Sequence, residues 1–343
     1  MFHFLSAGGK ISSDHLRYLR EYFEEKGIEY VCHEGVVYGD ELVAGDAYLT
    51  CSILAIDANP VQLESIFEVQ LAHNLTGIKG NPFHQRAGDL NIFGGRQVAV
   101  HQRLDMSDSR FVLGGYPKWD FIYPERHRVE ERRQELASEK GLDPSVPWVC
   151  FYPTGPNLMV RGGLARVFEI LSSVERKLGA NEFLICNHAQ NRKMGETKKT
   201  LEKIEELLGD SKSFDSSVVG GEGESRVHLV DGSDALRHIT ACDLFITDVA
   251  STLITAVSMG KPVAQIPVKK KHERSVDFSV MLKGAFLKDI DDLKVFVEGY
   301  ETLKKLRDLF QNCVEFDDDK NCERITQLVL NRYEKWRKER GVK

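Results

Sequence analysis

The 343-residue sequence lacks the features of several protein classes. It has no low-complexity tract, and its 42% hydrophobic and 29% charged residues are typical of a globular chain, which excludes a disordered or fibrous protein. No stretch reaches the roughly 18 apolar residues that a membrane-spanning helix requires, and Met1 to Leu5 form no basic leader. We therefore expect a protein that does not cross a membrane.

An excess of positive charge is also missing. The formal net charge of −6 excludes a protein that coats nucleic acid nonspecifically, because such a protein needs cations that face phosphate. The seven cysteines form no C-x-x-C pair, and most lie in apolar runs such as Trp148 to Phe151. We expect them to be reduced core residues of a cytoplasmic protein.

Common nucleotide and metal motifs are absent as well. Gly8-Gly9-Lys10 follows a predicted strand, but it fits neither G-x-G-x-x-G nor a P-loop. The acidic runs 289–292 and 317–319 are typical of loops and helix caps, and no Asp-x-Asp pair clearly ends a strand. We predict no obligatory metal or cofactor.

What the sequence does contain is a repeated alternation of strands and helices. A strand at 2–7 precedes a helix that ends at Lys26, whose Leu16, Leu19 and Phe23 share one face and should pack on a sheet. Further strands are predicted at 28–32, 47–56 and 97–100, and a second series at 148–152, 182–187, 227–230, 244–247 and 262–266. The second series alternates with helices at 164–178, 195–208, 233–241 and 252–259, and a surface loop is predicted at 211–224. This alternation predicts parallel sheets covered by helices.

The length suits two such domains. A charged helix at about 126–140 leads into the second series, so we place a Rossmann-like N-terminal domain at 1–143 and a second domain at 144–322. A long amphipathic helix at 323–343 should pack back towards the N-terminal domain. Ligands of parallel sheets lie beyond the carboxyl ends of the strands.

The segment from Ala241 to Val263 carries the most information about a site. Its strand ends at Thr247-Asp248, small residues follow, and a helix begins near Thr252. The free amides of such a helix start, with the hydroxyls of Ser251 and Thr252, suit a phosphate group. The alternative is that Ser251 and Thr252 only cap the helix and that Asp248 braces the turn.

Five segments in order resemble the motifs of the CDP-glycerol glycerophosphotransferase family, whose members prime and polymerise teichoic acids. They are Gln70 to Gly80, Gly115 to Asp120, Tyr152 to Thr154, Asn187 to Ala189, and Ala241 to Val263. The resemblance implies an α/β fold of the GT-B type, with two Rossmann-like domains, a cleft between them and a C-terminal crossover helix. It implies that residues 144–322 bind the nucleotide donor and that residues 1–143 bind the acceptor.

The sequence departs from the family's pattern at several positions. Ala72 replaces a tryptophan, Lys118 replaces an arginine, Ala189 replaces a proline, and Val249-Ala250 replace a tyrosine and a serine. Exchange of arginine for lysine loses a bidentate phosphate contact. A divergent member with a different donor or acceptor fits these changes.

Two histidines are the sharpest candidates for catalytic roles. His73 matches the family's proposed base, which takes the proton of the acceptor hydroxyl. His188 would hydrogen-bond the pyrophosphate of the donor or protonate the leaving phosphate. The alternatives are a structural role for His73 and a surface loop for His188. The other candidates are donor-binding Thr154, Asn157, Asp248, Ser251 and Thr252, and acceptor-binding Lys10 and Lys79.

These observations lead to three functional hypotheses. The first is transfer of a polyol-phosphate unit from a CDP-alcohol to a hydroxyl acceptor with release of CMP, in the synthesis of a cell-surface polymer or glycolipid. The second is a GT-B glycosyltransferase that uses a nucleotide sugar, and the third is a non-catalytic binding protein with the same fold. Tyr333 and Trp336 lie among cations near the C-terminus, either on the outer face of the last helix or as an attachment to the inner face of an anionic membrane.

Overall fold

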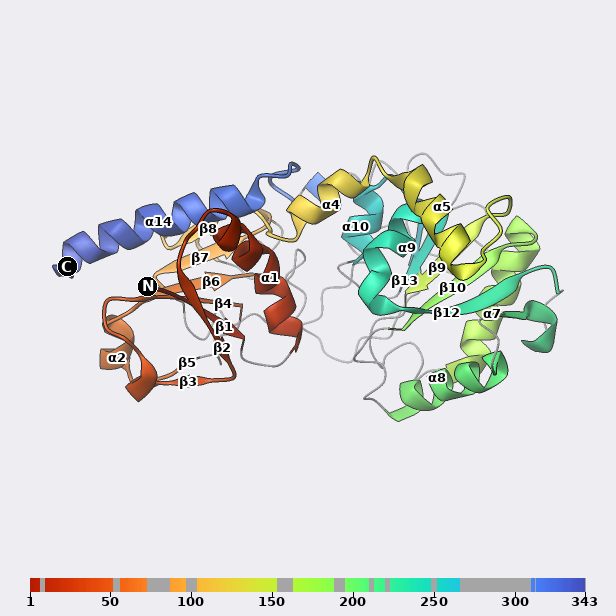
Figure 1. The fold of residues 1–343 in the computed structure, drawn as a ribbon, viewed down its shortest axis with the longest axis horizontal. Coiled ribbons are helices and arrows are strands. Elements are labelled where there is room, and N and C mark those ends of the chain that lie inside the picture. Colours follow the sequence, from red (N-terminus) through yellow and green to blue (C-terminus); the bar gives the residue numbers. More distant parts are fainter. Residues whose placement is uncertain are drawn as a thin grey trace. The chain divides into compact units, whose positions relative to one another are not determined.

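The computed structural model describes residues 1–6, 10–51, 56–72, 87–96, 104–152, 163–187, 195–209, 213–219, 223–247, 252–265, 310–311 and 313–342. The chain divides into two compact units (Figure 1). Unit 1 comprises Met1–Tyr123 and Gln311–Lys343, and unit 2 comprises Pro124–Phe310. Within these described residues, each unit contains a six-stranded sheet.

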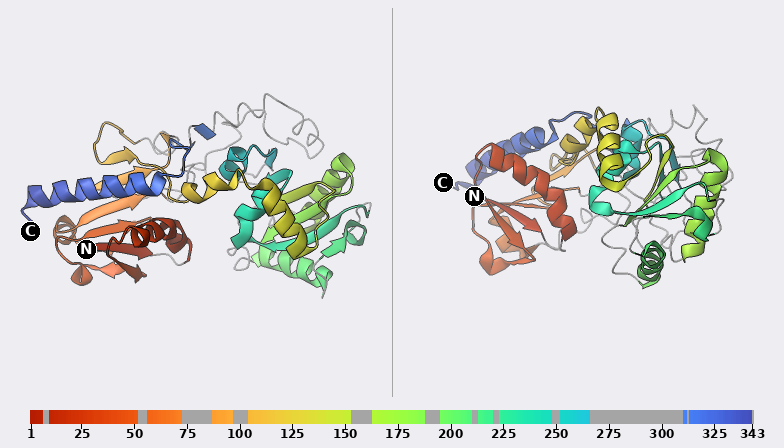
Figure 2. Two further views of the ribbon diagram at one scale, coloured as in Figure 1. Left: turned by 45° about the horizontal axis from the view of Figure 1, so that its top comes forward. Right: turned by 45° about the vertical axis from the view of Figure 1, so that its right-hand side comes forward.

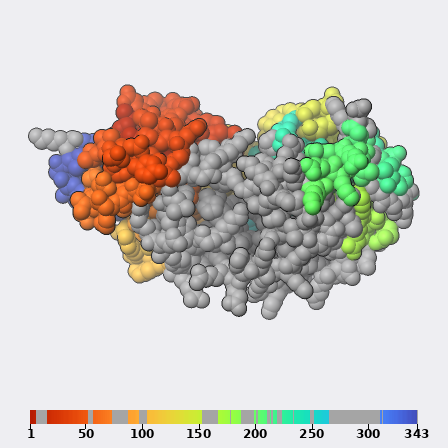
Figure 3. Space-filling view, turned by 90° about the horizontal axis from the view of Figure 1, so that it is seen from below, coloured from red at the N-terminus to blue at the C-terminus, as the bar shows by residue number. Residues whose placement is uncertain are grey.

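The sheet of unit 1 is parallel throughout. Its strand order is β2-β1-β4-β6-β7-β8. The strands are β1 (Phe2–Ser6), β2 (Tyr30–Glu34), β4 (Ala47–Thr50), β6 (Phe67–Leu71), β7 (Leu90–Phe93) and β8 (Phe111–Leu113). A smaller sheet of β3 (Val37–Tyr38) and β5 (Ile56–Asp57) accompanies the short α2 (Pro60–Glu64). The N-terminal residues form one continuous red-to-orange surface in Figure 3.

Two helices from opposite ends of the sequence cover one face of this sheet. Helix α1 (Lys10–Glu25) contributes Leu16, Leu19 and Phe23 to the core, as the periodicity predicts, and α14 (Asn321–Arg340) contributes its own apolar side chains. Figure 2 shows α14 lying along the strands of unit 1. The buried residues of α14 in this core are Cys322, Ile325, Val329, Tyr333 and Trp336.

The segment Gly115 to Asp120, which resembles a family motif, holds the beginning of α14. The carboxylate of Asp120 accepts hydrogen bonds from the backbone N–H groups of Asn321 and Cys322, both at 2.7 Å. The side chain of Asn321 donates to Asp120 at 2.9 Å and accepts from the N–H of Tyr116 at 3.1 Å. Gly115 has φ of 102°, and a Cβ there would lie 2.2 Å from Asn321 Oδ1. In this structure, Gly115 to Asp120 therefore fasten the last helix to unit 1.

The described sheet of unit 2 has the order β11-β12-β10-β9-β13-β14. Its edge strand β11 is antiparallel to β12, and the other described pairs of strands are parallel. The strands are β9 (Trp148–Tyr152), β10 (Glu182–Asn187), β11 (Ser213–Asp215), β12 (Arg226–Asp231), β13 (Leu244–Thr247) and β14 (Val263–Gln265). The helices are α5 (Val129–Lys140), α7 (Gly163–Leu178), α8 (Gly195–Leu208), α9 (Ala235–Ala241) and α10 (Thr252–Ser258). The parallel alternation predicted for this half is confirmed.

The division of the chain differs from the expected one. It falls between Tyr123 and Pro124, within α4 (Trp119–Glu125), and not at 143/144, because α5 packs on α9. Arg133 on α5 donates to Asp243 at 2.8 Å and stacks 4.5 Å from the ring of Trp148. The second division falls between Phe310 and Gln311, so the return to unit 1 begins before the expected residue 323.

Several other elements differ from the sequence-based prediction. The segment 213–219 was predicted to be a loop, but it forms β11 and a 3₁₀ turn (Ser216–Val219). The buried carboxylate of Glu175 holds this segment, because it accepts hydrogen bonds from Ser216 Oγ and from the N–H groups of Glu224 and Ser225. Strands β7 and β8 were not predicted. The expected strand at 97–100 lies outside the described residues.

The aromatic pair of α14 is not available to a membrane. Tyr333 and Trp336 are each 7% exposed and pack against Phe67, while Arg337 and Arg340 stack on the two rings. Both rings therefore belong to the core of unit 1, and the expected place on the outer face of the helix is wrong. Contact of the chain with a membrane stays a prediction. Among the described helices, none has the length and apolar character needed to span a bilayer.

All seven cysteines are free thiols, and six of them are buried, as expected of core residues. Cys32 is the exception, because it lies exposed on the edge strand β2. Cys150 and Cys186, on neighbouring strands, have their sulfur atoms 3.4 Å apart.

The fastening of α14 is testable by substitution. Asp120→Ala removes the acceptor of two helix-start amides and should lower the free energy of unfolding by about 1–2 kcal/mol. Urea denaturation of the full chain measures this change. Asp319→Ala is the control, since Asp319 is exposed in the same segment, and an equal effect of the two substitutions would contradict the assignment.

A buried histidine in unit 2 predicts acid sensitivity. His238 on α9 is 0% exposed, and neither ring nitrogen has a hydrogen-bond partner within the described residues. Burial, helped by the charge of Lys140, lowers the pKa of His238 to about 4 from an unfolded value of about 6.5. The unfolded chain therefore binds a proton first, and stability is complete above about pH 6.5 and is lost as the pH falls towards 4.

Between about pH 7 and about pH 5 this linkage amounts to roughly 2 kcal/mol. His238→Leu should abolish this part of the decrease in the free energy of unfolding between the two pH values, as measured by urea denaturation at each pH. Substitution of the exposed His127 by Leu should leave the loss unchanged. A wild-type pH dependence in His238→Leu would rule out this origin.

Candidate functional site

The strand order of unit 2 creates a topological switch point. From β9 the chain proceeds to β10 and β12 on one side, and it then returns to β13 and β14 on the other side of β9. In sheets of this order, ligands bind at the carboxyl ends of the strands where the order reverses. The carboxyl ends of β9 and β13 are therefore the first place to look for a ligand.

Three predicted donor-binding segments follow three adjacent strands. His188 directly follows the end of β10, Thr154 comes two residues after β9, and Asp248 directly follows β13. The order β10-β9-β13 places these strands side by side in the centre of the sheet. The described strands thus bring the beginnings of all three segments to one edge. His188, Thr154, Asn157, Asp248 and Ser251 themselves lie outside the described residues.

A side-chain hydrogen bond joins the carboxyl ends of β9 and β13. Thr247 and Tyr152 end β13 and β9 in register, and the Thr247 hydroxyl donates to the Tyr152 carbonyl at 2.8 Å. Both residues are buried, with exposures of 0% and 4%. A side-chain hydrogen bond at the ends of two parallel strands fixes their separation where the connecting segments begin.

Thr252 is the donor-site candidate whose side chain the structure describes. It begins α10, and the next four residues of this helix are buried. The hydroxyl oxygen of Thr252 is buried and has no hydrogen-bond partner within the described part of the chain. A hydroxyl can both donate and accept, so an unpaired one is available for a ligand oxygen.

The acceptor-site candidates belong to unit 1, where the strand order reverses between β1 and β4. Lys10 begins α1, but its side chain is not described, and His73 and Lys79 lie outside the described residues. His73 comes two residues after the end of β6, which pairs with β4. The roles of these three residues stay predictions.

The structure adds a polar row that the sequence reasoning missed. Thr50, Gln70 and Asn91 lie in register on β4, β6 and β7, and their side chains are all at most 2% exposed. The Gln70 amide nitrogen donates to Glu68 at 3.0 Å, while the Gln70 side-chain oxygen is buried with no partner among the described residues. The signal was present as polar residues that alternate with apolar ones in Phe67–Leu71.

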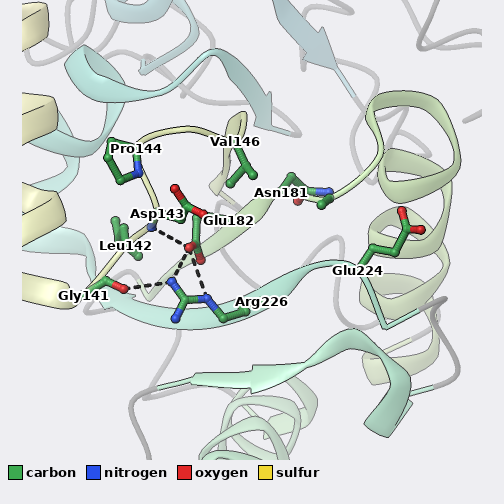
Figure 4. Close-up of a pocket in the computed structure, with 10 residues that line it drawn as sticks. Gly141, Leu142, Asp143, Pro144, Val146, Asn181, Glu182, Glu224 and Arg226 are labelled. Atoms are coloured by element: carbon green, nitrogen blue, oxygen red, sulfur yellow. Dashed lines mark hydrogen bonds and ion pairs between the residues drawn. The ribbon is translucent and has the colours of Figure 1, made fainter.

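A pocket of about 540 Å³ lies at the opposite, amino edge of the unit 2 sheet (Figure 4). Glu182 and Arg226 start β10 and β12, and both line the pocket. The carboxylate of the buried Glu182 pairs with Arg226 and with His228. Although burial alone would raise it, these bonds hold the pKa of Glu182 below its ordinary value. This pocket contains none of the predicted site residues.

The acidic triplet 317–319 has structural partners. Asp317 accepts from the indole N–H of Trp119 at 3.0 Å, and Asp318 pairs with Arg324 at 2.8 Å. Within the described ranges, no three histidine, cysteine or acidic side chains are placed to hold a metal ion. Independence from a metal cofactor stays a prediction.

No protein-family model matches the sequence, and no curated protein matches it. Solved structures do match in fold. The wall teichoic acid polymerase TagF has a TM-score of 0.58 and 14% identity, over 98% of this chain and 89% of that chain. A glycosyltransferase from Rickettsia africae has a TM-score of 0.57 and 10% identity, over 98% of both chains.

A third match is S. aureus MnaA, whose structure contains UDP, with a TM-score of 0.55 and 12% identity over 98% of this chain and 97% of that chain. One of the similar TagF structures is a variant soaked with CDPG. At these identities the similarity concerns the fold. The chain has the GT-B type of α/β fold, with two Rossmann-like units and a C-terminal helix that packs on the first unit.

Proposed function

We propose that this chain is a transferase that moves a polyol-phosphate unit, such as glycerol phosphate, from a CDP-alcohol to a hydroxyl acceptor and releases CMP. One observation carries the proposal. Three segments that resemble family motifs follow three adjacent strands at the carboxyl edge of the unit 2 sheet, in a chain whose fold is similar to TagF over 98% of its length. Ligands of sheets with this strand order generally bind at that edge. The acceptor would belong to a cell-surface polymer or glycolipid made at the inner face of the membrane.

In the proposed reaction His73 removes the proton of the acceptor hydroxyl, and the acceptor oxygen attacks the β-phosphorus of the donor in line. The bond from the β-phosphorus to the bridging oxygen breaks, so that the polyol phosphate stays on the acceptor and CMP leaves. Ser251, Thr252 and His188 stabilise the negative charge that develops on the leaving phosphate. General base catalysis of this kind contributes about 10²- to 10⁴-fold in rate.

The remaining candidates bind the two substrates. Thr154 and Asn157 contact the nucleotide donor, and Asp248 braces the segment between β13 and α10. Lys10 and Lys79 hold a phosphate group of the acceptor. No obligatory metal takes part, because the hydroxyls, amides and histidines supply the stabilising donors.

A glycosyltransferase that uses a nucleotide sugar is the second candidate. It is favoured by the similarity to the Rickettsia africae glycosyltransferase over 98% of both chains. Such an enzyme would use the same edge of unit 2 for its donor, but the acceptor would attack the anomeric carbon, and UDP or GDP would leave. The two candidates therefore differ in the nucleotide that is released.

The identity of the donor is tested by thermal stabilisation. CDP-glycerol, CDP-ribitol, CMP, UDP-sugars and GDP-sugars are each added to the full chain at about 100 times the dissociation constant, where a ligand should stabilise the fold by roughly 2.7 kcal/mol. Cytidine nucleotides should stabilise the protein selectively. Selective stabilisation by a uridine or guanosine sugar nucleotide would favour the glycosyltransferase.

Thr252→Val is the matched test of the donor position. Because the Thr252 hydroxyl has no partner within the described residues, its removal should leave the unliganded protein as stable as the wild type. The affinity for the donor, measured from the thermal shift at a series of donor concentrations, should fall about tenfold. Ser258→Ala is the control, since the Ser258 hydroxyl donates to the Thr255 carbonyl of the same helix at 2.6 Å and so already has a partner. An unchanged donor response in Thr252→Val would remove Thr252 from the donor site.

The catalytic base is tested by turnover. His73→Gln should lower CMP release from CDP-glycerol in the presence of acceptor by about 10²- to 10⁴-fold and leave the donor-induced thermal shift intact. His188→Gln should lower both the rate of CMP release and the donor-induced thermal shift. Turnover at the wild-type rate in His73→Gln would overturn the assignment of the base. Loss of both turnover and donor binding in this variant would indicate a structural role for His73.

A further inference from the structure

Strand β2 forms one edge of the parallel sheet of unit 1 (Figure 1). Within the described residues it pairs with β1 alone, and the register with β1 continues without a break over all five residues of β2. The hydrogen-bonding groups on the outer side of β2 therefore meet no other strand among these residues. An edge of this kind is a template for another strand, because its N–H and C=O groups are unpaired.

The β2 edge lacks the features that usually prevent the addition of a strand. Natural edges are often shortened, bulged, or protected by proline or lysine. The opposite edge of the same sheet, β8, has three residues, whereas β2 has five. Residues 28–38 contain no proline, lysine or arginine, and the register of β2 with β1 contains no bulge. Val31 and Cys32, in the middle of β2, are exposed, so the edge is open to a partner strand.

The face of β2 that lies towards α1 carries one cation and one anion. Arg20 of α1 lies against Cys32, and its Nη1 donates to the Cys32 sulfur, a weak acceptor, at 3.3 Å. Glu34 comes two residues after Cys32, so it lies on the same face of the strand, and it is exposed. Within the described part of the chain, the structure shows no ion pair for Arg20 or for Glu34. Both charges are therefore available to a partner chain.

A second copy of β2 that runs antiparallel to the first fits this edge. Two copies that pair about a two-fold axis at Cys32 place Tyr30 of one copy opposite Glu34 of the other. In the same register Val31 lies opposite His33, and Cys32 lies opposite itself. No two like charges face each other across the pair, so the sequence of β2 is compatible with pairing to itself.

The same register brings the two available charges together. Diagonal neighbours on paired antiparallel strands are about 7–8 Å apart, and Glu34 of the second copy is the diagonal neighbour of Cys32. Because Arg20 lies on Cys32 and has a long side chain, its guanidinium reaches this carboxylate. The two-fold axis repeats the contact, which gives one ion pair between the chains at each end of the strand pair. This charge complementarity is the reason for choosing a second copy of the chain as the partner.

We propose that the chain forms a two-fold symmetric homodimer in which β2 of one copy pairs antiparallel with β2 of the other. The two sheets of unit 1 then join into one continuous sheet, and Arg20 of each copy pairs with Glu34 of the other. A strand pair of this length covers less than the about 1,200 Å² of a standard interface, so we expect a weak dimer that depends on chain concentration. The dimer is independent of the reaction proposed above.

Sedimentation equilibrium of the full chain at about 1 µM to 1 mM tests the proposal. The mass should rise with concentration from that of one chain towards that of two. Glu34→Arg and Arg20→Glu each bring like charges together and should weaken the dimer about fivefold or more, whereas the variant with both changes should restore it. Glu64→Arg is the control, because it makes the same change of charge at an exposed position of α2 in unit 1. Melting temperatures establish that each variant is folded.

Cys32 provides an independent test, because it lies on the proposed axis and the other six cysteines are buried. A short bismaleimide should link two chains through Cys32, and Cys32→Ser should abolish this link but keep the dimer in sedimentation. A chain that stays a monomer up to about 1 mM would overturn the proposal. A dimer that neither charge variant weakens, that the double variant does not restore, or that the bismaleimide does not link would overturn it as well. None of these outcomes depends on the identity of the nucleotide donor.

Discussion

A parallel sheet must bury both of its faces, and unit 1 does so with a helix from the far end of the chain. The apolar side of α14 completes the core that Phe2, Phe67 and α1 begin. Asp120 and Asn321 fix the start of that helix through hydrogen bonds between its first amides and the α4 region. The first unit is therefore complete only when the last residues of the chain have returned to it, which explains why its two parts enclose unit 2 in the sequence.

The parallel core of unit 2 was predictable because its strands are long apolar runs that are separated by amphipathic helices. The assignment of α5 was not, because it rests on the packing of α5 against α9 and on contacts such as Arg133 with Asp243, between residues that are far apart in the sequence. Short strands such as Phe111–Leu113 escaped prediction, since three residues show no periodicity. The turn at Ser216 depends on the buried carboxylate of Glu175, which local sequence cannot indicate.

The candidate site was also predictable from the sequence only in part. Sequence motifs named the segments after β9, β10 and β13, but only the strand order shows that these three strands are neighbours. The motif from Gly115 to Asp120 resembles a family signature, yet its described contacts are structural and fasten α14. Some buried groups have no hydrogen-bond partner among the described residues, namely the Thr252 hydroxyl and the side-chain oxygens of Gln70 and Asn181, and the sequence alone could not show this.

We propose that the carboxyl edge around β9 and β13 binds a cytidine nucleotide. A crystal structure of the full chain soaked with CDP-glycerol would locate the nucleotide. We expect electron density for the pyrophosphate within about 3 Å of the Thr252 hydroxyl, beyond the ends of β9 and β13. Nucleotide density at the amino edge beside Glu182 and Arg226, or at no position in unit 2, would rule out this donor site.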